Sequence, residues 1–183
     1  DSEALRAAES EDPEDIRHYY LQLPEGMERI AQHAKWVVSD LENRFDRALA
    51  IEQYLRANYR YSLTPVPENK GMSLEQFLFS IKEGHCEYFA SAMGVMLRTL
   101  GIPCRIVNGF VGNEYNRFGK FFQVRQSDAH SWVEVSFPGS GWVPFDPTPS
   151  TPQRQFDLLR TVRQIIDIAE STWITYFVDY SIH

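Results

Sequence analysis

The sequence has 183 residues, 43% of them hydrophobic and 23% charged, and its formal net charge is −7. This composition suits a folded domain with its own core and excludes a disordered chain. The acidic balance argues against nucleic acid as a partner, because the chain would repel phosphate groups. No apolar run reaches the roughly 18 residues needed to cross a bilayer. Because the sequence opens with Asp1 rather than Met, we expect it to be a piece of a longer protein.

Apolar residues recur at helical spacing through most of residues 1–63. Pro13 opens a predicted helix that Pro24 ends, since proline is tolerated in a first helical turn but not in a helix interior. Two further helices are predicted over 25–41 and 45–59. The first part of the chain is therefore expected to be helical.

A loop is expected at 64–72, where two prolines and a glycine gather. Ser73 and Gln76 then have the spacing of a capping box, which predicts the start of a short helix. We expect Gly84 to close this helix in the left-handed conformation.

Residues 86–100 give the strongest helix prediction in the chain. Small residues fill several of its inner positions: Ala90, Ser91, Ala92 and Gly94. Small side chains let other backbones come close, so we expect a buried central helix. Gly101 is expected to cap its C-terminal end, and Pro103 prevents its continuation.

After Gly101 the apolar period changes to two, which is typical of strands. Strands are predicted over 104–111, 121–125, 129–137 and 142–146, with a polar loop over 112–120 and a turn over 138–141. A block of helices followed by sequential strands predicts an α+β fold with an antiparallel sheet. A further amphipathic helix is predicted over 153–183.

Cys86 has the sequence context of a thiol nucleophile. It lies in the first turn of the predicted central helix, where unpaired N–H groups and the positive end of the helix dipole stabilise a thiolate. The same N–H groups can donate to a tetrahedral oxyanion. The other cysteine, Cys104, lies in a predicted strand and is expected to be a buried, inert thiol. A disulfide between the two would abolish activity.

His130, at the head of a predicted strand, is the natural base, and Asp146, at the end of the next strand, can hold the imidazole in the required tautomer. The pairing of the two strands decides whether these side chains meet. With Phe137 opposite Trp142, His130 and Asp146 would lie on opposite faces. The triad therefore requires a shifted register, for instance Ser136 opposite Trp142, or a bulge.

Other residues near these positions allow more than one interpretation. Asp128 is a rival partner for His130. His85 and Tyr88 suit either packing or an active-site wall with an oxyanion role. Trp132 suits the core, or such a wall. Glu134 is either a hydrogen-bonded buried carboxylate or a charge that faces substrate.

Four segments together resemble the transglutaminase-like domain of bacteria: Gly84–Ala90, Gly101–Arg105, His130–Val135 and Gly141–Thr148. The resemblance covers about residues 45–150. It implies a papain-like fold, in which the helix that bears the cysteine packs on an antiparallel sheet that bears the histidine and the aspartate.

The resemblance also implies the reaction of a protein-glutamine gamma-glutamyltransferase. Cys86 attacks a glutamine carboxamide, ammonia leaves with a proton from His130, and a primary amine takes the acyl group from the thioester. The implied partners are a protein or peptide glutamine donor and a primary amine acceptor, with no cofactor and no metal. Membrane-anchored bacterial members carry such a domain outside the cytoplasmic membrane. We therefore expect a periplasmic domain of an inner-membrane protein, with membrane contact only through segments outside this sequence.

We expect three parts: an N-terminal helical extension over 1–44, the catalytic core over 45–150 and a C-terminal helical extension over 151–183. Two other functions stay open. The same triad could serve a cysteine peptidase or amidase, or the domain could be a catalytically idle binding scaffold of the cell envelope.

Overall fold

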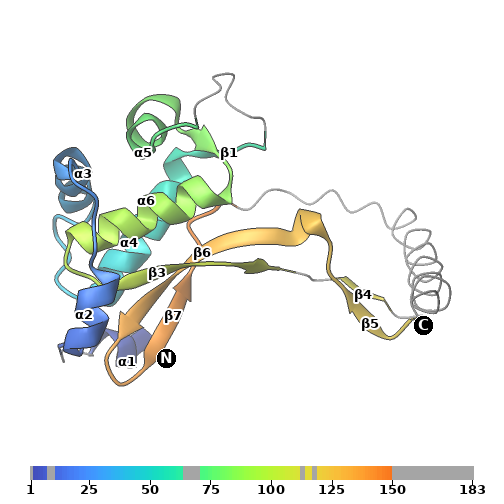
Figure 1. Ribbon diagram of the computed structural model, residues 1–183. Coiled ribbons are helices and arrows are strands. Elements are labelled where there is room, and N and C mark those ends of the chain that lie inside the picture. The colour runs from blue at the N-terminus through green and yellow to red at the C-terminus, as the bar shows by residue number, and fades with distance from the viewer. Residues whose placement is uncertain (1, 8–10, 64–70, 112–113, 117–118, 150–183) are drawn as a thin grey trace, which may run out of the picture. The chain divides into compact units, whose positions relative to one another are not determined.

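The computed structural model in Figure 1 describes residues 2–7, 11–63, 71–111, 114–116 and 119–149. The chain divides into two compact units, one of Asp1–Gly109 with His130–Thr151 and one of Phe110–Ala129 with Pro152–His183. The helix predicted over 153–183 lies outside the described residues.

The first unit begins with four helices, of which the last three correspond to the predicted ones and the first was not predicted. They are α1 (Ser2–Arg6), α2 (Glu14–Tyr20), α3 (Glu28–Val37) and α4 (Arg44–Asn58). Asn43 caps α4, because its side-chain oxygen accepts a hydrogen bond from the backbone N–H of Asp46 at 2.8 Å. The apolar faces of α3 and α4 are fully buried at Ile30, Ala34, Ala48, Ile51 and Leu55.

A buried polar cluster ties the segment before α2 to the rest of this unit. The carboxylate of Asp12 accepts a hydrogen bond from Ser136 Oγ at 2.7 Å and from Arg44 Nη1 at 3.0 Å. Asp12 is only 8% exposed, and a buried carboxylate is tolerated where cationic and hydroxyl donors surround it. The N-terminal helices are thus anchored to the sheet.

The capping box predicted for the short helix is present. Gln76 N donates to Ser73 Oγ at 3.2 Å and Ser73 N donates to Gln76 Oε1 at 2.8 Å. The helix α5 (Leu74–Gln76) continues directly into a π-helical turn, η1 (Phe77–Ile81).

The prediction that Gly84 ends this segment in the left-handed conformation is wrong. Lys82 takes that conformation, with φ of 55°. Gly84 lies instead in a short strand, β2 (Glu83–Gly84), which pairs in parallel with β1 (Arg60–Tyr61). A Cβ at Gly84 would lie 2.9 Å from Tyr88 Cδ2, so glycine is required there by close approach and not by a turn.

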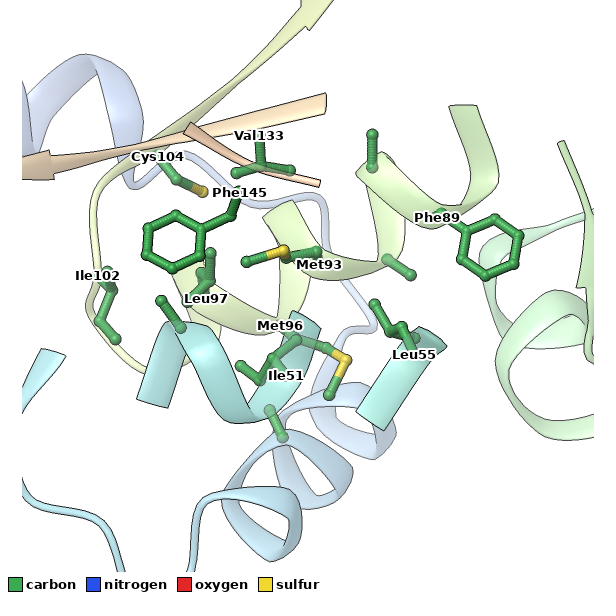
Figure 2. Close-up of a cluster of buried hydrophobic side chains, with 14 of the residues drawn as sticks. Ile51, Leu55, Phe89, Met93, Met96, Leu97, Ile102, Cys104, Val133 and Phe145 are labelled. Carbon is green, nitrogen blue, oxygen red and sulfur yellow. The ribbon is translucent and has the colours of Figure 1, made fainter. Parts of the chain in front are cut away.

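The central helix α6 (Cys86–Thr99) is buried as predicted, and Gly101 follows it with φ of 74°. Figure 2 shows the core that forms around it, with Met93, Met96 and Leu97 of α6 among the labelled side chains. Side chains of α4 and of the sheet complete the cluster, among them Ile51, Leu55, Cys104, Val133 and Phe145. Burial of these apolar side chains is the main contribution to the stability of this unit.

The sheet of the first unit has the strand order β3-β6-β7, formed by β3 (Cys104–Phe110), β6 (Ala129–Phe137) and β7 (Gly141–Phe145). β6 and β7 are antiparallel, and the predicted α+β fold is confirmed. Ser136 pairs with Trp142 and Val133 with Phe145. This is the shifted register that the sequence argument required.

The second unit contains a hairpin of β4 (Glu114–Asn116) and β5 (Phe121–Gln123), followed by a 3₁₀ turn, η2 (Gln126–Asp128). The whole of 112–120 was predicted to be a loop, and the strand β4 within it corrects that prediction. Tyr115 lies opposite Phe122 in the hairpin, with ring centroids 5.1 Å apart. This cross-strand aromatic pair contributes to the stability of the hairpin.

Candidate active site

Cys86 is the first residue of α6, and it is 9% exposed. His85 precedes it with an extended backbone, and within the described structure its side chain makes no capping hydrogen bond. The first N–H groups of a helix have no partner inside the helix, so those of α6 can stabilise an anion beside the thiol. Both cysteines are free thiols.

The histidine and the aspartate singled out by the sequence meet across β6 and β7. The register places Asp146 diagonally from His130, and His130 Nε2 lies 2.8 Å from Asp146 Oδ2. Because the carboxylate accepts a hydrogen bond from Nε2–H, the other ring nitrogen, Nδ1, is left as the basic one. The two side chains therefore meet as the sequence argument required, and their catalytic role stays a prediction.

The second carboxylate oxygen and the backbone N–H of Asp146 also form hydrogen bonds. Its Oδ1 accepts a hydrogen bond from the backbone N–H of Thr148 at 3.0 Å. Its own N–H donates to Oε1 of Glu52, on α4, at 2.8 Å. Burial raises the pKa of Glu52, and the nearby Asp146 carboxylate raises it further. Glu52 is a site neighbour that sequence reasoning missed, because an acidic residue on a helix normally faces solvent.

Trp132 lies on the same strand and face as His130. The two rings are nearly parallel, at 18°, with centroids 6.4 Å apart. A Cβ at Gly109 would lie 2.8 Å from Trp132 Cη2, so the indole packs closely over the neighbouring strand at that glycine. Trp132 thus lies beside the imidazole and is partly buried.

His85 and Tyr88 contact each other, with ring centroids 4.8 Å apart. Tyr88 also stacks on Phe77, at a centroid distance of 5.7 Å, and joins the edge of the apolar core. His85 is more exposed, and its Nδ1 lies 3.8 Å from Glu87 Oε2. These contacts give Tyr88 a packing role and leave the His85 side chain partly exposed.

Tyr61, on β1, is a neighbour of Cys86 that sequence reasoning missed. Burial raises the pKa of Tyr61, and the charge of the nearby Cys86 thiolate raises it further. The tyrosine is brought there by the pairing of β1 with β2, in which Tyr61 lies opposite Gly84. Nothing in the sequence indicates a parallel pair of two-residue strands.

The structure also shows the surroundings of three further residues that the sequence singled out: Cys104, Asp128 and Glu134. Cys104 is fully buried, and burial raises the pKa of its thiol to about 11, as expected for an inert cysteine. Asp128 accepts a hydrogen bond from the backbone N–H of Arg125 at 2.7 Å, in a local turn. Glu134 is a partly buried carboxylate paired with a neighbouring strand: Arg105 Nη2 lies 2.7 Å from its Oε2.

In the part of the chain that the structure describes, no cluster of three or more His, Cys, Asp or Glu side chains could hold a metal ion. The same part of the chain contains no helix that is both long and apolar enough to cross a membrane.

Comparisons with known proteins point to one family. The family model of the Transglutaminase-like superfamily matches residues 31–147. YebA of Bacillus subtilis is 43% identical over 137 residues, which make up 70% of this chain and 19% of YebA. A protein-glutamine gamma-glutamyltransferase of Pseudomonas aeruginosa is 39% identical over 101 residues, or 55% of this chain and 15% of that protein. The chain therefore spans less than a fifth of these curated relatives.

Solved structures show the same similarity. The periplasmic domain of TgpA from Pseudomonas aeruginosa matches with a TM-score of 0.66 and 35% identity, covering 76% of this chain and 50% of that one. A protein of Cytophaga hutchinsonii, described as a candidate cysteine protease, matches with a TM-score of 0.58 and 22% identity, over 78% of this chain and 45% of that one. These matches confirm the predicted papain-like, transglutaminase-like fold.

Proposed function

Because the chain belongs to the transglutaminase-like superfamily, we propose that it catalyses cysteine-dependent acyl transfer from glutamine side chains, through a thioester on Cys86. The observation that carries this proposal is the 2.8 Å contact between His130 Nε2 and Asp146 Oδ2, made possible by the hairpin register. It prepares an imidazole whose Nδ1 can take a proton from a thiol.

In the first half-reaction, the sulfur of Cys86 bonds to the carboxamide carbon of a glutamine, and His130 Nδ1 holds the proton that the thiol released. The oxyanion of the tetrahedral intermediate accepts hydrogen bonds from the first N–H groups of α6. His130 then gives its proton to the departing nitrogen, so that ammonia leaves and a thioester remains. Asp146 stabilises the positive imidazolium throughout.

In the second half-reaction, a primary amine attacks the thioester carbon. His130 Nδ1 accepts the proton of the amine and returns it to the sulfur of Cys86 as the carbon–sulfur bond breaks. The products are an isopeptide bond and the free thiol. If water takes the place of the amine, the same steps deamidate the glutamine.

The side chains around the triad have proposed supporting roles. The partly buried Trp132 lies parallel to the imidazole and would shield the thiolate–imidazolium pair from water, which strengthens the pair. His85 and Tyr88, on either side of Cys86 in the sequence, would form a wall of the site, with Tyr88 held by its stacking on Phe77.

The substrates and the compartment are also proposals. One similar protein is named a protein-glutamine gamma-glutamyltransferase and one similar structure is a periplasmic domain. We therefore propose a protein or peptide glutamine as acyl donor, a primary amine as acceptor, and an extracytoplasmic site of action at the cell envelope.

The test is the incorporation of a fluorescent primary amine, dansylcadaverine, into a glutamine-rich protein such as casein. We expect incorporation by the wild type, none by Cys86→Ala, and near wild-type incorporation by Cys104→Ala. Glutamine or peptide-bond hydrolysis that depends on Cys86, without amine incorporation, would replace transfer by hydrolysis. No turnover together with an unreactive Cys86 would favour the binding scaffold.

A further inference from the structure

The free edge of β7 determines where the backbone of Asp146 finds a partner. Pro144 has no N–H and lies opposite Glu134, so this pair is one of the positions at which the ladder exchanges no hydrogen bond. Bonded and non-bonded positions alternate along antiparallel strands. The N–H of Asp146, two residues further on, therefore also points away from β6. β7 is the edge strand of the described sheet, so no described strand meets this N–H.

Glu52 of α4 supplies the missing acceptor. Its Oε1 accepts the hydrogen bond from Asp146 N at 2.8 Å, and α4 packs against β7 and against α6. With the bonds from Thr148 N and His130 Nε2, three contacts hold Asp146: one at its main chain and two at its side chain. The contact from Glu52 fixes the peptide plane from which the carboxylate extends.

The surroundings of Glu52 include two features that disfavour a negative charge. Glu52 is a half-buried carboxylate beside a second carboxylate, and both burial and the like charge of Asp146 raise its pKa. The hydrogen bond from the Asp146 N–H lowers that pKa, and so does the charge of Arg56, one turn further on along α4. A neutral acceptor such as glutamine could make the same hydrogen bond without this repulsion, so the charge itself requires an explanation.

We propose that Glu52 is a positioning residue of the acyl-transfer site, an inference that rests on the proposed function. Its hydrogen bond holds the backbone of Asp146 so that the carboxylate meets His130. Its negative charge adds to that of Asp146 and favours the imidazolium form of His130, which is the partner of the Cys86 thiolate.

Two variants separate the hydrogen bond from the charge. Glu52→Gln keeps an oxygen acceptor for Asp146 N and removes the charge, whereas Glu52→Ala removes both. Glu42→Gln is the matched control, because Glu42 is an exposed carboxylate that lies just before α4. The readouts are the pH dependence of kcat/KM for amine incorporation and the pH dependence of Cys86 alkylation by iodoacetamide.

For Glu52→Gln we expect kcat/KM to fall about fivefold, as when a charged hydrogen-bond partner is replaced by a neutral one. We also expect the alkaline step of both pH profiles to move to lower pH, because the imidazolium loses a stabilising charge. Two charged groups face the Glu52 carboxylate: Asp146, just after β7, and Arg56 of α4. His130 of β6 is linked to Glu52 through its contact with Asp146. Glu52→Ala should lose more activity, on the order of tenfold or above, since misplacing a catalytic group is costly.

Profiles of Glu52→Gln that superimpose on those of the wild type and of Glu42→Gln would overturn the proposal. If Glu52→Ala unfolds, Glu52→Gln still decides the matter, provided that its melting temperature matches the wild type. The alkylation profile needs no acyl substrate. A wild type that incorporates no amine, but whose alkaline alkylation step shifts in Glu52→Gln, would refute the proposed function and support the role of Glu52.

Discussion

The two cysteines of the chain lie at different places on the helix α6, one in its first turn and one beside its middle. The first place favours a thiolate and the second a protonated thiol. Cys86 lies at the first turn, where helix N–H groups have no internal partner and can stabilise a thiolate. Cys104 of β3 lies beside the middle, where its Sγ donates to the Gly94 carbonyl oxygen at 3.3 Å. A carbonyl partner and full burial favour the protonated thiol. One helix therefore provides a site for an anion at its end and a site for a neutral thiol at its side.

The largest expected effect is a difference in alkylation rate between the two cysteines. At about pH 7.5, a thiol with a pKa near the value of about 11 for Cys104 is ionised in only about three molecules in ten thousand. We expect iodoacetamide to modify Cys86 on the order of a hundredfold or more faster than Cys104 in the native protein. Peptide mapping by mass spectrometry measures both rates, and the urea-unfolded chain is the control, in which the rates should converge. Comparable native rates would contradict the contrast.

The next effect concerns Asp146. Asp146→Ala removes the acceptor for His130 Nε2–H, so the imidazole loses its fixed tautomer and its stabilising charge. We expect kcat/KM for amine incorporation to fall on the order of a hundredfold or more, with little change in the protection of Cys104 from alkylation. Steady-state kinetics and the mapping experiment above test both statements. An unchanged kcat/KM would exclude Asp146 from the triad.

Two contacts of Asp146, one with His130 and one with Glu52, show which parts of the site can be predicted from sequence. The meeting of His130 with Asp146 could be made a condition on the hairpin, because side chains alternate along strands and every second register puts both residues on the same face; the structure adopts one of these, with Ser136 opposite Trp142. The contact of Glu52 with Asp146 N could not be predicted, because it depends on how α4 packs against β7. Helical periodicity shows which face of a helix is apolar, but not which polar residue at its border meets another element.

The same limit applies to the backbone around the nucleophile. Gly84 was noticed as a helix-ending glycine, yet its small size is needed for the approach of Tyr88, and Lys82 takes the left-handed conformation. A lysine in that conformation carries no signal in the sequence, since other residues adopt it more readily. The parallel pair that places Tyr61 near Cys86 is likewise too short to leave a pattern.

A smaller effect follows from the pKa of Cys104. Burial raises the pKa of its thiol from the ordinary value of 9.0 to about 11, so the unfolded chain loses this proton at lower pH than the folded chain does. This difference in pKa leaves the free energy of unfolding unchanged below about pH 9. As the pH rises from 9 toward 11, the free energy of unfolding falls by at most roughly 2–3 kcal/mol. Cys104→Ala has no thiol to ionise at this position, so its stability should fall less than that of the wild type between pH 8.5 and 10.5.

Urea unfolding at these two pH values measures that difference. Other groups that ionise in alkali are common to both proteins, so they cancel when the two changes in the free energy of unfolding are subtracted. Equal losses of stability in Cys104→Ala and the wild type would show that Cys104 ionises in the folded protein as readily as in the unfolded chain.

The smallest expected effect tests how closely Cys104 and the middle of α6 must approach. A Cβ at Gly94 would lie 3.4 Å from Ile106 Cγ1 and 4.0 Å from Cys104 Sγ, which are ordinary contact distances. Alanine in a helix interior is favoured over glycine by roughly 0.5–1 kcal/mol, so Gly94→Ala should stabilise the protein by up to about that amount. Its melting temperature should rise by about 1–4 °C, and its amine incorporation should match the wild type. A fall in melting temperature would mean that the packing of β3 on α6 requires glycine, and that the neutral-thiol site depends on the small side chain as well as on burial.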